Sequence, residues 1–344
     1  MSDMENISLE KQVVYELCVR NFNKEGTFDS LRQELKRIWA MGVDIICLLP
    51  VYNMEDPENP DPELGDEEQF QALVEAIHRY RMKCVLDVTL TGEDRQIPML
   101  LRWAALVDGF RCVNGEQVSE SCAERVLEAV AGVKADCIWL AENDRSGKLD
   151  SSSRDDAYRA FRGYLAGENS LAEFARIETE EGMQGPRICY LERRDTPRSR
   201  KLIGEETGFL NWICFHYFRK GMTLLCAGQE MECVTYSDPD KKDPINWNEG
   251  MNNLDLIYGL YLIRQEQLPE SGDYRVEALE GNGLLALWQS EQATLVGVFA
   301  VGGEPVQAQV PLADGNYENL LDGDQVRVRG GKLDCMGTPI MIRG

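Results

Sequence analysis

Residues 83–113, KCVLDVTLTGEDRQIPMLLRWAALVDGFRCV, decide the fold of this chain. Two runs that are apolar at nearly every position flank an amphipathic segment, residues 97–106. Strands that are buried on both faces of a parallel sheet have such continuous apolar runs, whereas half-exposed strands alternate. The stretch therefore predicts a parallel strand–helix–strand unit, with Asp87 in the first strand and Arg111 in the second.

The same alternation extends over most of the chain. Similar apolar runs occupy residues 12–20, 44–51, 137–143, 187–195 and 222–230. Helical patterns lie between and after them, at residues 27–42, 67–82, 119–132, 169–182, 210–221 and 253–267. With residues 157–165 taken as a weak sixth strand, this count predicts an α/β fold, a closed (β/α)8 TIM barrel over residues 1–267.

The pattern changes over residues 268–344. Short alternating strands are separated there by Gly, Asp and Asn turns, without strong helical patterns. We expect a small C-terminal antiparallel β-domain that packs against the barrel.

The composition excludes several classes of partner. Of the 344 residues, 59 are Asp or Glu and 36 are Lys or Arg, which gives a formal net charge of −23. A nucleic acid or an anionic membrane surface would be repelled, so neither is expected as a partner. No apolar stretch approaches the roughly 18 residues of a membrane-spanning helix, and no secretory signal is expected at the N-terminus.

The cysteines and histidines also limit the chemistry. Six of the eleven cysteines lie in apolar strand-like runs and no C-x-x-C pair occurs, which is typical of reduced thiols in a cytoplasmic protein. The two histidines, His78 and His216, both fall in helical patterns and are expected to be packing residues. We expect no metal site and no cofactor. Because both histidines are expected to be packing residues, acid–base chemistry would depend mainly on carboxylates.

In a barrel of this type, functional residues lie at the C-terminal ends of the strands. The polar residues there are Asp87, Arg111, Glu142 and Asp195. Their order and setting resemble the alpha-amylase family, glycoside hydrolase family 13. VDGFRCV is similar to the fourth strand of that family (G-F-R-x-D), WLAEN to the fifth, which ends in Glu, and CYLERRDTP to the seventh, which ends in N-H-D. The resemblance covers nearly the whole chain, including the β-domain.

The resemblance implies hydrolysis of O-glycosyl bonds by three carboxylates: a nucleophile, a general acid/base and a transition-state stabiliser. Carried over by motif, Glu142 matches the acid/base and Asp195 the stabiliser. The nucleophile position, two residues after Arg111, holds Val113, which cannot form a glycosyl ester.

The chain departs from the family pattern at three further places. Thr91-Gly92 and Arg193-Arg194 each stand where the family has Asn-His. The family also inserts a subdomain after its third strand, often with a calcium site, where this chain has little more than one helix. These losses indicate a degenerate member of the family.

Each candidate residue also has a structural alternative. Glu142 could pair with Arg111 across the barrel, and Asp195, which precedes Thr-Pro, could be a helix N-cap. Asp87 and Arg111 are candidate substrate-binding residues that could equally hold the barrel mouth together, because a buried arginine requires a carboxylate partner.

Arg193 and Arg194 are further candidates for substrate binding. They could keep Asp195 ionised, or bind an anion such as a phosphate or a sugar acid. At least one of them is expected to be solvated, because neighbours in a strand face opposite ways. Glu116 or Asp94, in nearby loops, could replace the missing nucleophile.

Two functional hypotheses follow. The first is a catalytically inactive or strongly altered homologue with a binding, regulatory or assembly role. The second is an active glycoside hydrolase with non-standard machinery that uses Glu142 and Asp195. The expected partner is an oligosaccharide, a sugar or a sugar phosphate, and a homo-oligomer is compatible with the first hypothesis.

Overall fold

The structure is a computed structural model that describes residues 8–53, 56–93, 96–180, 186–204 and 206–344. Eight parallel strands form a closed barrel in the order β1-β10-β9-β8-β7-β6-β5-β2, with β2 paired back to β1. The predicted (β/α)8 barrel is thus confirmed. The strands are β1 (Val13–Leu17), β2 (Ile45–Leu48), β5 (Lys83–Val88), β6 (Gly109–Cys112), β7 (Ile138–Ala141), β8 (Ser151–Ser153), β9 (Arg187–Cys189) and β10 (Met222–Cys226).

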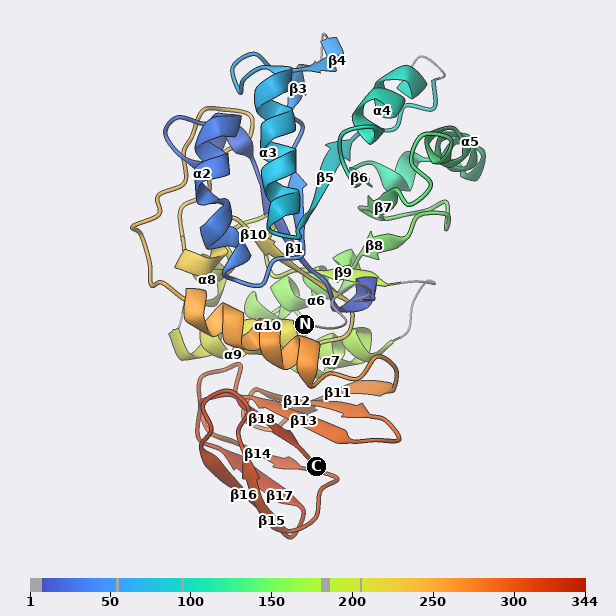
Figure 1. Cartoon of the computed structure of the whole chain (residues 1–344). Helices are drawn as coiled ribbons and strands as arrows, with labels where there is room; N and C mark the ends of the chain where they lie inside the picture. Colours follow the sequence, from blue (N-terminus) through green and yellow to red (C-terminus); the bar gives the residue numbers. More distant parts are fainter. Residues whose placement is uncertain (1–7, 54–55, 94–95, 181–185, 205) are drawn as a thin grey trace.

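Helices surround this barrel, and most of them were predicted from their periodicity (Figure 1). Their apolar faces are buried against the strands; in α2, for example, Phe28, Leu31, Leu35 and Ile38 are buried. The helices are α1 (Val19–Phe22), α2 (Phe28–Trp39), α3 (Glu67–Arg79), α4 (Ile97–Ala104), α5 (Glu120–Ala131), α6 (Asp155–Leu165), α7 (Leu171–Thr179), α8 (Ser199–Ile203), α9 (Glu206–Phe218) and α10 (Leu254–Glu266). The described residues also form short 3-10 helices, namely η1 (Leu9–Lys11), η3 (Gly115–Gln117) and η4 (Gln229–Met231).

The sixth strand was predicted wrongly. Residues 157–165 belong to helix α6, whose buried positions Ala157, Tyr158, Ala160 and Phe161 follow a helical spacing. The strand at this place is β8, three consecutive serines that pair with β7 and β9. Three serines form neither an apolar run nor an alternation, so no sequence pattern predicts this strand.

Two four-stranded antiparallel sheets follow the barrel. One has the order β11-β12-β13-β18 and the other the order β14-β17-β16-β15. Their facing side chains form a separate apolar cluster that includes Leu285, Val298 and Leu333. The strands are β11 (Asp273–Leu279), β12 (Gly283–Gln289), β13 (Thr294–Phe299), β14 (Val306–Gln309), β15 (Gly315–Glu318), β16 (Gln325–Arg329), β17 (Lys332–Cys335) and β18 (Ile340–Arg343).

The first of these sheets packs against the helices of the barrel. Figure 1 shows the orange and red strands below α7, α9 and α10. The Trp288 indole donates a hydrogen bond to the Phe218 carbonyl at 2.9 Å, and the Phe218 and Phe299 rings are 5.7 Å apart. The apolar core of the barrel therefore continues into the sheet.

A small hairpin, β3 (Tyr52–Asn53) and β4 (Asp56–Pro60), lies in the acidic loop after β2. Arg102 of α4 ties the loop to the barrel, because it donates to the Glu58 carbonyl at 2.7 Å. Among the described residues, none of the helices is both long and apolar enough to cross a lipid bilayer.

The eleven cysteines are free thiols, and both histidines lie on helices as expected. His216 of α9 is fully buried, and its Nε2 donates to the Leu224 carbonyl at 3.0 Å. Burial, with a smaller contribution from Arg219, lowers the pKa of His216 to about 3. The ring is therefore a neutral packing group.

His216 should make the protein sensitive to mild acid. The unfolded histidine gains a proton near pH 6.5, whereas the folded one stays neutral, so stability falls as pH drops below 6.5. In urea unfolding, the wild type should lose about 2 kcal/mol more than His216→Gln between pH 7 and pH 5. Equal losses in the two proteins would contradict this role.

Candidate functional site

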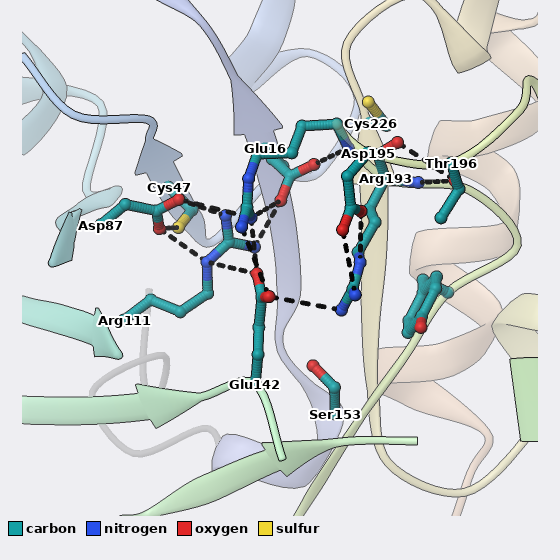
Figure 2. A network of polar contacts seen from close by, with 12 residues as sticks. Glu16, Cys47, Asp87, Arg111, Glu142, Ser153, Arg193, Asp195, Thr196 and Cys226 are labelled. Atoms are coloured by element: carbon teal, nitrogen blue, oxygen red, sulfur yellow. Dashed lines mark hydrogen bonds and ion pairs between the residues drawn. The ribbon is translucent and has the colours of Figure 1, made fainter. Parts of the chain in front are cut away.

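Four strands, of which β5, β6 and β7 are adjacent and β1 is separated from β5 by β2, bring charged side chains together at the carboxyl mouth of the barrel. Glu16 comes from β1, Asp87 from β5, Arg111 from β6, and Glu142 directly follows β7. The pairing of β5 with β6 sets Asp87 beside Arg111 in register. Figure 2 shows these side chains converging on one another.

Arg111 lies at the centre of this cluster and is 1% exposed. Its Nε and Nη2 donate to the two oxygens of Asp87 at 2.6 and 2.7 Å, and Nη1 lies 2.5 Å from Glu16 Oε2. Burial opposes the charge of Arg111, but Asp87 and Glu16 raise its pKa well above the usual value. The guanidinium is thus a permanent cation held by two fully buried carboxylates.

Glu142 is bound mainly by Arg194. Its Oε1 accepts from Arg194 Nη1 at 2.5 Å and its Oε2 accepts from Arg194 Nη2 at 3.3 Å. Arg111 Nε is farther from it, at 3.9 Å. The predicted partner of Glu142, Arg111, is therefore within ion-pair range, but Arg194, which was expected to pair with Asp195 or to bind an anion, donates to both carboxylate oxygens of Glu142.

Arg193 separates Glu142 from Asp195. Its Nη1 is 3.6 Å from Glu142 Oε2 and 3.3 Å from Asp155 Oδ1, while its Nε donates to Asp195 Oδ1 at 2.6 Å. Figure 2 shows Arg193 between the two candidate catalytic carboxylates. The guanidinium also lies over the Tyr190 ring, 4.9 Å from its centroid.

Both arginines turn towards the mouth, so the expectation that one of them is solvated was wrong. The side chains of Arg193 and Arg194 are only 12% and 19% exposed. Strand β9 ends at Cys189, so the two arginines belong to a loop in which strand alternation does not apply.

Asp195 is not a helix N-cap, which overturns that alternative. Helix α8 begins at Ser199 after Arg198, and the Ser199 amide donates to Glu192 instead. The Asp195 side chain is 48% exposed. Partial burial opposes its charge, but its hydrogen bonds with Arg193 lower its pKa below the usual value. Arg193 therefore keeps Asp195 ionised, as predicted.

No carboxylate stands at the nucleophile position. Val113 follows β6, and its amide donates to the Val88 carbonyl at 3.0 Å. The side-chain amide of the next residue, Asn114, makes two hydrogen bonds of 2.9 Å with the backbone of Leu90: its Oδ1 accepts from the Leu90 amide and its Nδ2 donates to the Leu90 carbonyl. These bonds stabilise the loop after β5. Glu116 is exposed in η3, and Asp94 lies outside the described residues.

A small cavity borders Glu16 and Arg194 and has a volume of about 30 Å³; neither Glu142 nor Val113 is among the residues that line it. One water needs about 10–15 Å³ by this measure, so the cavity holds about two waters and no pyranose ring. Within the described residues, no group of three or more His, Cys, Asp and Glu is arranged to hold a metal ion.

Sequence reasoning missed two members of this network, Glu16 and Asp155. Glu16 is a charged residue inside the apolar run of the first strand, a signal that could have been used, because a buried charge requires a partner. Asp155 accepts from the Tyr190 hydroxyl at 2.7 Å. It could not be found, because it follows the unpredicted strand β8.

A closed parallel barrel with carboxylates and an arginine at its carboxyl mouth, followed by an antiparallel β-domain, has the layout that the resemblance implied. Residues 275–342 match the bacterial alpha-amylase C-terminal domain. The chain is 23% identical to alpha-amylase MalA of Haloarcula japonica over 92% of its own length, and it spans 60% of that relative.

Solved structures agree on the fold. An alpha-amylase from Lactobacillus plantarum superposes with a TM-score of 0.90 at 22% identity, covering 98% of this chain and 99% of that one. The noncanonic maltogenic alpha-amylase AmyB from Thermotoga neapolitana superposes with a TM-score of 0.86 at 19% identity, covering 97% and 99%. AmyP, solved in complex with maltotriose, superposes with a TM-score of 0.81 at 13% identity, covering 97% of both chains. The chain therefore has the fold of these alpha-amylases and resembles the alpha-amylase family, glycoside hydrolase family 13.

Arg111 should be essential for stability. Its removal leaves Glu16 and Asp87 as buried charges without their main counter-ion, which typically costs about 3–5 kcal/mol. We expect Arg111→Met to lower the free energy of unfolding by this amount in urea titrations.

The matched control is Arg32→Met in α2, where the Arg32–Asp29 ion pair is nearly half exposed. Such a pair contributes about 0–1 kcal/mol, so this variant should unfold almost as the wild type does. Adding Asp87→Asn to Arg111→Met should recover part of the loss. A loss in Arg111→Met no larger than in Arg32→Met would contradict the buried-charge argument.

Proposed function

We propose that this alpha-amylase-like protein does not hydrolyse glycosidic bonds and that it acts as a saccharide-binding, non-catalytic member of its family. The observation that carries the proposal is that Arg193 and Arg194 fill the space around Glu142 while Val113 stands at the nucleophile position. The arginines or the valine alone would weaken catalysis, because the arginines affect the acid/base step and the valine affects the nucleophilic step.

The first effect concerns the nucleophile. Retaining hydrolysis needs a carboxylate that attacks the anomeric carbon, and valine has no atom that can do so. The second effect concerns the acid/base. A general acid must present a proton to the leaving oxygen, whereas both oxygens of Glu142 accept hydrogen bonds from Arg194.

The lack of an inserted subdomain does not support the proposal. The alpha-amylase from Lactobacillus plantarum is covered over 99% of its length by this chain. An alpha-amylase-like chain therefore need not contain a large additional subdomain. Only the residues at the barrel mouth therefore support the proposed lack of hydrolysis.

A neutral saccharide fits the charge of the mouth better than a sugar phosphate does. Three guanidinium groups, from Arg111, Arg193 and Arg194, face five carboxylates, from Glu16, Asp87, Glu142, Asp155 and Asp195. The network is therefore negative overall and disfavours an added phosphate. AmyP, which shares the fold, has been solved with maltose and with maltotriose bound.

Turnover on maltotriose, maltoheptaose and p-nitrophenyl α-maltoside tests the proposal, with an active alpha-amylase assayed alongside. The wild type and Glu142→Gln should release equally little product, at the level of the buffer. Turnover in the wild type that Glu142→Gln abolishes would establish the alternative, an active hydrolase that uses Glu142 and Asp195.

Restoring the nucleophile alone should not restore activity. In Val113→Asp the new carboxylate lies at a partly buried site, but Arg194 still donates to both oxygens of Glu142. We expect Val113→Asp to remain inactive in the same assay. If this variant is active, the arginines do not block the mouth.

A further inference from the structure

We propose that a surface cleft beside α8 is a binding site for a neutral oligosaccharide. The cleft, called the α8 cleft below, has a volume of about 650 Å³. Its lining includes Arg200, Glu232, Val234, Tyr236, Glu249 and Met251. It lies between α8 and the long loop that joins β10 to α10, which run on the same side of the barrel in Figure 1.

The cleft gathers exposed apolar side chains. Among the described residues, seven large hydrophobic side chains are exposed, and three of them, Val234, Tyr236 and Met251, line this cleft. They are 37%, 42% and 52% exposed. Exposed apolar residues that cluster in a hollow, rather than scatter singly, indicate a binding surface.

Tyr236 is held in a fixed orientation. Its hydroxyl donates to the carbonyl of Arg194 at 2.8 Å, which joins the cleft to the loop that closes the barrel mouth. An anchored ring gives a ligand a flat apolar contact, and little side-chain freedom is lost on binding.

The polar residues of the cleft are also fixed in advance. Glu249 accepts from the amides of Val234 and Thr235 at 3.0 and 2.9 Å. Glu232 accepts from Arg200 Nε at 2.8 Å. Carboxylates and a guanidinium oriented in this way can exchange hydrogen bonds with hydroxyl groups along the rim.

The charges favour a neutral ligand. Glu206, Glu232 and Glu249 line the cleft against Arg200 and Lys201, so an anion gains no net attraction. An apolar platform with a hydroxyl-binding rim suits a pyranose, which has C–H faces and hydroxyl edges. The volume lies within the usual range of about 300–1,000 Å³ for small-molecule sites.

This inference rests on the proposed function only in taking a saccharide as the ligand. It adds that the ligand binds outside the barrel mouth, at residues that play no part in the family's chemistry. Binding in the cleft and turnover at the mouth are separate measurements, so each proposal can fail without the other.

Isothermal titration of the full chain with maltotriose, isomaltotriose and cellotriose tests the site. At least one probe should bind, and Tyr236→Ala should weaken it roughly tenfold, as for loss of one aromatic anchor. Met251→Ala, which removes apolar surface from the cleft, should weaken the same probe to a smaller extent.

Two controls separate the cleft from other surfaces. Tyr258→Ala removes a tyrosine of similar exposure, 44%, on α10 outside the lining of the cleft, and should leave binding unchanged. Arg32→Met, at an exposed ion pair of α2, should also leave it unchanged. Absence of binding by all three probes, or binding that falls in Glu142→Gln but not in Tyr236→Ala and Met251→Ala, would overturn the proposal.

Discussion

The buried charge of Arg111 is the constraint on which the mouth of the barrel depends. A guanidinium that is 1% exposed cannot stay in the core without carboxylates, and Asp87 on the neighbouring strand β5 and Glu16 on β1 supply them. The parallel register of β5 with β6 makes this pairing possible, because it sets Asp87 directly beside Arg111. Once these charges are fixed, the loop after β9 has to pack against a site that is already strongly polar.

The arginines of that loop determine what the mouth can do. Arg194 binds Glu142 and approaches Asp87, and Arg193 joins Glu142 to the half-exposed Asp195. In the pattern of the alpha-amylase family, which the chain resembles, a histidine stands at position 194; here a longer and permanently charged side chain binds Glu142 instead. The carboxylates of the mouth therefore belong to an internal salt-bridge network.

The sequence predicted the barrel well, because continuous apolar runs and helical spacing are local signals. It failed at β8, where three serines pair only through their backbones, and at Asp155, which follows that strand. Asp87, Arg111 and Glu142 were found from their places at strand ends. Their partners Arg193 and Arg194 were harder to predict, because the orientation of these two side chains towards the mouth depends on where β9 ends. No sequence pattern indicates that Cys189 is the last residue of β9.

Repulsion among the buried carboxylates links the arginine at position 194 to the valine at position 113. Glu16, Asp87 and Glu142 are each at most 6% exposed and lie around one buried cation, so the mouth without Arg194 holds more negative than positive charge. An active site accepts such repulsion when catalysis requires it, and relieving it commonly increases stability and reduces activity. An arginine at position 194 supplies the missing counter-charge, and after that a carboxylate at position 113 would add only further repulsion. Under the proposed loss of hydrolysis, the valine and the arginine are therefore two parts of one change, which lowers the repulsion among the carboxylates of the barrel mouth.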